Sequence, residues 1–199
     1  MAVTLEQLRR YAIARSLFKP TTLLAAIRRL GFVQADPMRA PARAQDLILF
    51  QRVKDYRAGD LERRYERLAL EEETFVNYGF VPREWTVLLH PRTPRRAWDA
   101  ATQRRAHELL AFVRERGAVH PREVSEAFAH HGRVAGYWGG DLNASTRLLE
   151  DMHRHGWLRV RRRESGTRVY EAVEHPPQDA SPARAQARAE ALVDHIVRL

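Results

Sequence analysis

The segment from Ala106 to Val173 carries the pattern that most restricts the fold, because three helical stretches are followed directly by two strands. AHELLAFVRERG, HPREVSEAFAHHG and NASTRLLEDMHRHG have apolar residues at helical spacing, and Gly117 ends the first of them. WLRVRRR and TRVYEAV then read as strands, joined by a short turn at Glu164-Ser165-Gly166. Three helices closed by such a hairpin form the winged-helix order, which we predict for residues 98–175.

The preceding residues predict a second unit of similar construction. TLEQLRRYAIARSLF is helical with a capping box of Thr4 and Gln7, and Gly31 ends a second helix, TLLAAIRRL. The extended piece Phe32–Ala35 leads to a helix in ARAQDLILFQRV, and EEETFVNYGFVPREW has the composition of strand and turn. The proline-rich stretch HPRTPRRA then closes a winged-helix-like unit over residues 1–97. We predict an α+β fold, mainly α with small β-hairpins, built as tandem winged-helix domains.

The remaining residues, 176–199, predict a linker followed by an amphipathic helix. Leu192, Ile196 and Leu199 share one side of that helix, which favours packing on a partner protein, on a second copy of the chain or on a further domain. No run of residues approaches the roughly 18 apolar positions that a membrane span needs. The start, MAVTLEQLRR, has no apolar core of a secretory signal, so we expect a cytoplasmic protein without a membrane partner.

The charge balance favours a polyanionic partner. Lysine and arginine number 34 against 25 acidic residues, for a net charge of +9, and all but Lys19 and Lys54 of these bases are arginine. Arginine suits phosphate recognition, although a GC-rich genome would also favour it, and the charge alone admits RNA as well as DNA. The absence of cysteine excludes disulfides and thiolate sites, and the histidines lack metal-binding spacing, so we expect no metal.

Arginines cluster in the predicted hairpin of residues 157–173. They are Arg159, Arg161, Arg162, Arg163 and Arg168. Such a hairpin can place arginines along a phosphate backbone, or it can use charge to keep its edge from pairing with other strands. On the third helix Arg147 is a further candidate DNA contact, but Glu150 and Asp151 lie beside it, which favours contact with the backbone over sequence reading.

Gln34 and Asp36 stand out in LGFVQADPMRAPARAQD, because an apolar run ends there in an amide and a carboxylate before a proline. Asp before Pro is an ordinary helix cap or Asx turn, and Gln34 could satisfy a backbone group. A carboxylate beside an amide is also what hydrolysis of a glycosidic bond to a base needs. The carboxylate takes a proton from water and stabilises the positive sugar, while the amide orients the water. Spacing alone leaves both interpretations open.

The stretch ARSLFKPTTLLAAIRRLGFVQADPMRAPARAQDLIL resembles the N-terminal unit of the AlkZ/YcaQ-type DNA glycosylases. These enzymes remove bulky alkylated purines and unhook interstrand crosslinks, and their tandem winged helices carry a Gln-x-Asp motif. YWGG (Tyr137–Gly140) and GWLRVRRRESGTRVYEA resemble a later unit of the family. The resemblance implies Asp36 as general base and Gln34 as the water-orienting residue. We add Arg39 and Arg43, which follow the motif, to the predicted DNA contacts.

The chain also departs from the family pattern. Gln45 occupies the position of a frequent histidine, ETFVNYGFVP lacks a second one, and the family adds a third winged helix beyond the point that corresponds to Leu199. Our hypothesis is a monofunctional, nucleoid-associated DNA glycosylase that acts on alkylated or crosslinked double-stranded DNA without metal or cofactor. The alternative is a non-catalytic winged-helix regulator or accessory factor, in which Gln34 and Asp36 are structural.

Overall fold

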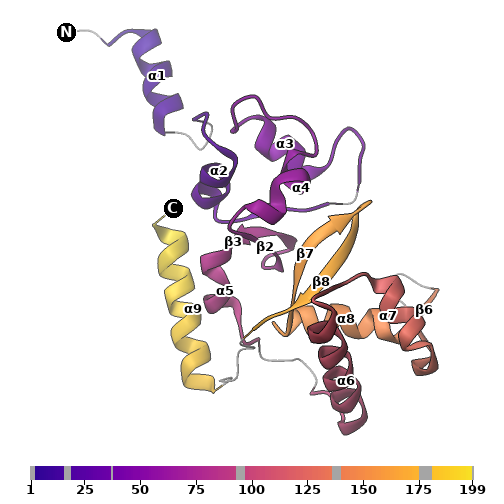
Figure 1. Ribbon diagram of the computed structural model, residues 1–199. Helices are drawn as coiled ribbons and strands as arrows, with labels where there is room; N and C mark the ends of the chain where they lie inside the picture. The colour runs from indigo at the N-terminus through magenta and orange to yellow at the C-terminus, as the bar shows by residue number, and fades with distance from the viewer. Residues whose placement is uncertain are drawn as a thin grey trace. The chain divides into compact units, whose positions relative to one another are not determined.

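The computed structural model describes residues 3–15, 19–36, 38–92, 97–135, 140–174 and 181–198. The chain divides into two compact units, Met1–Trp85 with Asp194–Leu199 and Thr86–Val193. Both units combine helices with a small antiparallel sheet, so the predicted α+β class is confirmed (Figure 1). Parts of several predicted segments lie outside the described residues, namely 16–18, Pro37, 93–96, Tyr137–Gly139, 175–180 and Leu199.

Along the chain of the first unit, a short strand follows two helices and precedes two others, and a β-hairpin comes after them. Its elements are α1 (Leu5–Arg15), α2 (Leu23–Leu30), β1 (Val33–Gln34), α3 (Ala44–Phe50), α4 (Asp60–Arg64), η1 (Tyr65–Arg67), β2 (Leu70–Thr74), β3 (Tyr78–Pro82) and η2 (Arg83–Trp85). The strands form an antiparallel sheet in the order β1-β3-β2. The strand and turn predicted for EEETFVNYGFVPREW are therefore confirmed as β2 and β3.

The predicted helix ends of the first unit are also confirmed. The Thr4 N–H donates to Gln7 Oε1 at 2.9 Å, and the Gln7 N–H donates to Thr4 Oγ1 at 3.2 Å, which is a reciprocal capping box. Gly31 closes α2 at φ 70°, where its N–H donates to the Ile27 carbonyl. A side chain would be strained at this φ, so glycine suits the tight exit from α2 into β1.

The core of the first unit forms between α2, α3, α4 and the sheet. Fully buried side chains include Leu23, Ile27, Val33, Leu49, Leu61, Leu70, Phe80 and Trp85. Burial of this size supplies most of the stabilisation of so small a unit. α1 takes no part in it, because its apolar side chains Leu5, Leu8, Tyr11 and Ile13 are all exposed.

The second unit has a similar order of elements. It contains α5 (Thr86–Leu89), α6 (Ala100–Arg116), β4 (Ala118–Val119), α7 (Pro121–Ala127), η3 (Ala129–His131), β5 (Arg133–Ala135), β6 (Asp141–Asn143), α8 (Ala144–Arg154), β7 (Leu158–Glu164), β8 (Thr167–Ala172) and most of α9 (Pro182–Val197). Helices α6 and α8 are longer than α2 and α4, and the strands β5 and β6 are additional. The main sheet has the antiparallel order β4-β8-β7. Leu109, Val113, Leu149, Met152 and Val160 are buried between it and the helices.

The hairpin β7–β8 turns in two residues, whereas the sequence suggested three. Glu164 pairs with Thr167 as the last rung of the ladder, and Ser165 and Gly166 form the turn with φ of 48° and 86°. Two positive φ values in a row characterise the turn type that matches the twist of the flanking strands. β4 pairs with β8 only at Ala118 and Val119. The outer part of the hairpin is therefore two-stranded, and Figure 1 shows it in orange extending from the helices of this unit.

The predicted C-terminal helix is present as α9, Pro182–Val197. Within the predicted apolar stripe Leu192 is partly buried, whereas Ile196 is 41% exposed and the adjacent Val193 is 58% exposed. The apolar side of α9 is thus largely open to solvent. Across the described ranges, no helix combines the length and the apolar character that crossing a bilayer requires.

Candidate active site

Gln34 and Asp36 lie where β1 ends in the first unit. Gln34 is the last residue of β1 and pairs with Gly79 of β3, and the next N–H, that of Ala35, donates to the Tyr78 carbonyl at 2.9 Å. The ladder stops at Asp36, whose Oδ1 accepts from the Met38 N–H at 2.8 Å in an Asx turn. Both side chains are partly buried. The expected Asx turn is thus present and holds the carboxylate in one orientation.

The second carboxylate oxygen of Asp36, Oδ2, has no hydrogen-bond partner among the described residues, and the same is true of the Gln34 amide group. The two side chains do not bond to each other either. The turn therefore fixes one oxygen of Asp36 and leaves the other able to accept a proton. An amide with an open donor and acceptor lies two residues upstream.

Gln45 holds the backbone of Asp36 from the first turn of α3. Its side chain is only 3% exposed, and its Oε1 accepts from the Asp36 N–H at 3.1 Å. Its Nε2 donates to Glu62 Oε1 at 3.0 Å, and the same oxygen accepts from Arg43 Nη1 at 2.5 Å. The amide of Gln45 thus links the Asp36 turn to an ion pair between α3 and α4.

Asp46 extends this set of contacts into the core. Its Oδ1 accepts from the Tyr56 hydroxyl at 2.9 Å and from the Gly59 N–H at 2.8 Å, and its Oδ2 lies 3.7 Å from Arg43 Nε. Burial, followed by the hydrogen bond to Asp46 and the charge of that carboxylate, raises the pKa of Tyr56 far above its usual range. The hydroxyl therefore remains a proton donor to Asp46 at any physiological pH.

Glu62 carries the least satisfied group of this network. Its Oε2 is buried and has no hydrogen-bond partner in the part of the chain that the structure describes. The charge of Arg43, 2.5 Å from Oε1, compensates the carboxylate. We call Arg43, Gln45, Asp46 and Glu62 the supporting network, because they connect the Asp36 turn to α3 and α4.

No role was predicted for the three consecutive glutamates of β2. Glu71, Glu72 and Glu73 are 4%, 1% and 5% exposed, although a run of glutamates is normally solvated. Glu71 bonds to Arg83 Nε at 2.6 Å, and Glu72 Oε2 accepts from the Tyr78 hydroxyl at 2.6 Å. These partners lie on the next strand or beyond it, so the local sequence carried no signal for this burial.

Glu73 and Gln34 both pair with Gly79, from opposite sides of β3. Directly opposed residues of antiparallel strands point to the same face of the sheet. A Cβ at Gly79 would come within 2.4 Å of the Val33 carbonyl oxygen and 2.5 Å of the Phe32 ring. Glycine here therefore lets Phe32 lie against β3 beside Gln34.

We expect Gly79→Ala to lower the free energy of unfolding of the first unit by about 2–3 kcal/mol, because the added methyl group forces backbone or ring to move. Chemical denaturation would measure the loss. Gly117→Ala serves as a comparison, since a Cβ there meets nothing within 4 Å and its loss therefore reports only the cost of a side chain at a φ of 79°. A loss below about 1 kcal/mol in Gly79→Ala would contradict close packing at Gly79.

The predicted DNA-contacting arginines of the first unit lie in different environments. Arg39 is exposed and has no ionic partner among the described residues. Arg43 belongs to the supporting network, where its guanidinium faces Glu62 and Asp46. In this structure Arg39 is thus available to an anion, whereas Arg43 is engaged inside the protein.

The predicted arginines of the second unit gather mostly on β7 and β8, and several are paired with carboxylates. Arg161 lies 3.6 Å from Glu171, Arg162 bonds to Glu164 at 2.5 Å, and Arg163 donates to the Gly166 carbonyl. Arg168 is opposite Arg163 in the ladder. Arg147 on α8 lies 3.5 Å from Asp151 and 3.9 Å from Glu150. DNA would have to compete with these carboxylates for most of the cluster.

Comparison with known proteins places this arrangement in a family. The family model described as DNA glycosylase AlkZ-like matches residues 27–199, which include the Gln34-Ala35-Asp36 motif, the supporting network and the whole second unit. No curated protein and no solved structure gave a match. The match extends over most of the chain, and the chain therefore belongs to the AlkZ-like DNA glycosylase family.

Proposed function

We propose that this protein is a DNA glycosylase that hydrolyses the N-glycosidic bond of bulky alkylated purines, with Asp36 as general base and Gln34 as the water-orienting residue. The observation that carries the proposal is the Asp36 carboxylate, held by the Met38 N–H through Oδ1, whose Oδ2 has no hydrogen-bond partner in the described part of the chain. The family match, which includes the motif, supports the choice of substrate.

In the proposed reaction the protein has two main tasks, to activate a water molecule and to stabilise the positive charge of the transition state. Alkylation at N7 makes the purine positive and weakens its bond to the sugar. Asp36 Oδ2 takes a proton from the attacking water, and its charge stabilises the positive sugar of the transition state. The open amide of Gln34 can donate to or accept from the same water. A bulky adduct reached from the groove would not require a deep pocket for a flipped base.

We further propose that the chain contains two winged helices, over residues 1–97 and 98–175, followed by a linker and helix at 176–199. The support is that α2-β1-α3-α4-β2-β3 and α6-β4-α7-α8-β7-β8 share one order of helices and strands, apart from η3, β5 and β6, which lie between α7 and α8. The sheets β1-β3-β2 and β4-β8-β7 also share one arrangement. Double-stranded DNA of the nucleoid, including interstrand crosslinks that join two alkylated purines, would be the natural substrate of such a tandem module.

The test is release of the base from duplexes that carry one N7-alkylguanine, a bulky N7 adduct or an N7–N7 crosslink. Chromatography of the free base together with strand cleavage at the resulting abasic site would identify the product. We expect release from the adducts and none from an undamaged duplex. Binding of all duplexes without release of any base would instead support the non-catalytic regulator.

One observation favours that second function. The Asx turn at Asp36 is sufficient to explain an aspartate before a proline, whether or not catalysis occurs. A regulator would retain DNA binding through its arginines and would use Gln34 and Asp36 only to end β1. Product analysis separates the two functions, whereas salt dependence does not, because both rest on phosphate contacts.

A further inference from the structure

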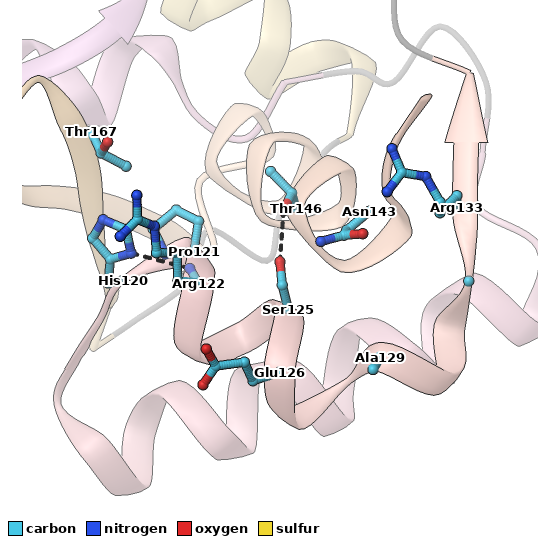
Figure 2. A pocket seen from close by; sticks show the side chains of 11 residues that line it. His120, Pro121, Arg122, Ser125, Glu126, Ala129, Arg133, Asn143, Thr146 and Thr167 are labelled. Atoms are coloured by element: carbon cyan, nitrogen blue, oxygen red, sulfur yellow. Dashed lines mark hydrogen bonds between the residues drawn. The ribbon is translucent and has the colours of Figure 1, made fainter. Parts of the chain in front are cut away.

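The second unit contains an open groove between α7, the start of α8 and the strands β5 and β6 (Figure 2). Its volume is about 640 Å³. Figure 2 shows His120 and Arg122 at one end of the groove and Arg133 and Asn143 at the other end. No part of the predicted active site lines it, so its chemistry needs a separate explanation.

Two guanidinium groups make the groove basic. Arg122 is exposed and has no ionic partner among the described residues. Arg133 donates through Nη2 to the Asp141 carbonyl at 2.6 Å, which holds its side chain, and its charge is paired with no carboxylate of a described residue. Glu126 is the one carboxylate among the described lining residues. The arginines of β7 differ, because Arg161 and Arg162 each lie beside a glutamate.

Neutral hydrogen-bonding side chains lie beside the two arginines and between them. His120 Nδ1 accepts from the Arg122 N–H at 3.1 Å, so the neutral ring carries its proton on Nε2. Asn143 occupies the N-cap position of α8 without making a side-chain capping bond, which leaves its amide free to bind a ligand. Ser125 and Thr146 share one hydrogen bond at 3.1 Å, and one of the two hydroxyl protons remains available. Figure 2 shows this pair in the middle of the groove.

We propose that this groove binds the sugar–phosphate backbone of a DNA strand. The arginine at each end suits a backbone phosphate, while the imidazole and amide beside them and the hydroxyl pair between them suit phosphate and sugar oxygens. An open groove of this size accommodates a strand that continues in both directions, unlike a closed site for one small anion. The proposal rests on DNA as the family substrate and not on catalysis at Asp36.

The test compares Arg122→Gln with Arg114→Gln, which removes the same charge from an exposed arginine on α6 that does not line the groove. Fluorescence anisotropy would give the Kd of an undamaged duplex over a range of salt concentrations. A direct phosphate contact predicts that Arg122→Gln lowers the slope of log K against log salt by about 1. Arg114→Gln is expected to leave that slope close to the wild-type value. Thermal unfolding of both variants confirms that they remain folded.

Equal changes of slope in the two variants would overturn the proposal, because net charge alone would then explain the binding. A second arm titrates deoxyguanosine monophosphate and inorganic phosphate against the 15N-labelled protein. Backbone shifts at Arg122 and Arg133 that saturate with the duplex, but only weakly with the small anions, support a strand-binding groove. Saturation with a small anion at lower concentration than with the duplex would overturn it in favour of a small-molecule site.

Discussion

Replacing Asp36 with asparagine is expected to lower the rate of base release by a factor on the order of 10² to 10⁴, the usual contribution of a general base. Asparagine removes the negative charge and the proton acceptor strength of Oδ2. It keeps an oxygen that can accept from the Met38 N–H, so the Asx turn survives. Single-turnover release from an N7-alkylguanine duplex would measure the effect on the chemical step.

The control for this experiment is binding and stability of the same variant. Since the turn is retained, Asp36→Asn should bind the duplex and unfold at the same temperature as the wild type. Asp36→Ala removes the acceptor as well, so it should lose both activity and about 1 kcal/mol of stability. Wild-type rates in Asp36→Asn would remove Asp36 from the mechanism, and the carboxylate would then serve only the turn.

The longer helices and the hairpins β2–β3 and β7–β8 were predictable because their signals are local, whereas α5 and the β5–β6 pair were not predicted. Gly31 and the Thr4–Gln7 capping box mark helix ends within a few residues, and the apolar spacing marks the buried faces. The motif could also be placed, since an extended run that ends at Asp-Pro predicts a turn. The short strands β1 and β4 pair with residues more than forty positions away in the sequence. Local patterns do not contain information about such distant partners.

The surroundings of the motif were less accessible to sequence reasoning. Gln45 was noted only as a departure from a family histidine, and its bond to Glu62 spans 17 residues. The run Glu71–Glu73 has the composition of a solvated surface, and its burial depends on Arg83 and Tyr78. The pairing of arginines with carboxylates on β7 and β8 was likewise hidden, because charge counts do not tell which charges meet.

Gln45→Met is expected to lower kcat for base release about tenfold with little change in KM. Methionine keeps the length and burial of the side chain but offers neither the acceptor for the Asp36 N–H nor the donor for Glu62. The turn that orients the Asp36 carboxylate then loses its hydrogen bond to α3. If that bond contributes about 1.4 kcal/mol to the stabilisation of the transition state, its loss lowers kcat by a factor of about ten. Gln51→Met, at the exposed end of the same helix, is the matched control.

A purely structural role for Gln45 would give a different result. The buried N–H and carboxylate left unpaired would lower the melting temperature, but the folded enzyme would keep its kcat. Gln45→Glu separates the two roles further. Its carboxyl can accept from the Asp36 N–H, and when protonated it can also donate to Glu62 Oε1, as the amide does. We therefore expect its kcat, relative to wild type at the same pH, to rise as the pH falls. A pH-independent ratio, together with full kcat in Gln45→Met, would show that Asp36 is oriented without Gln45.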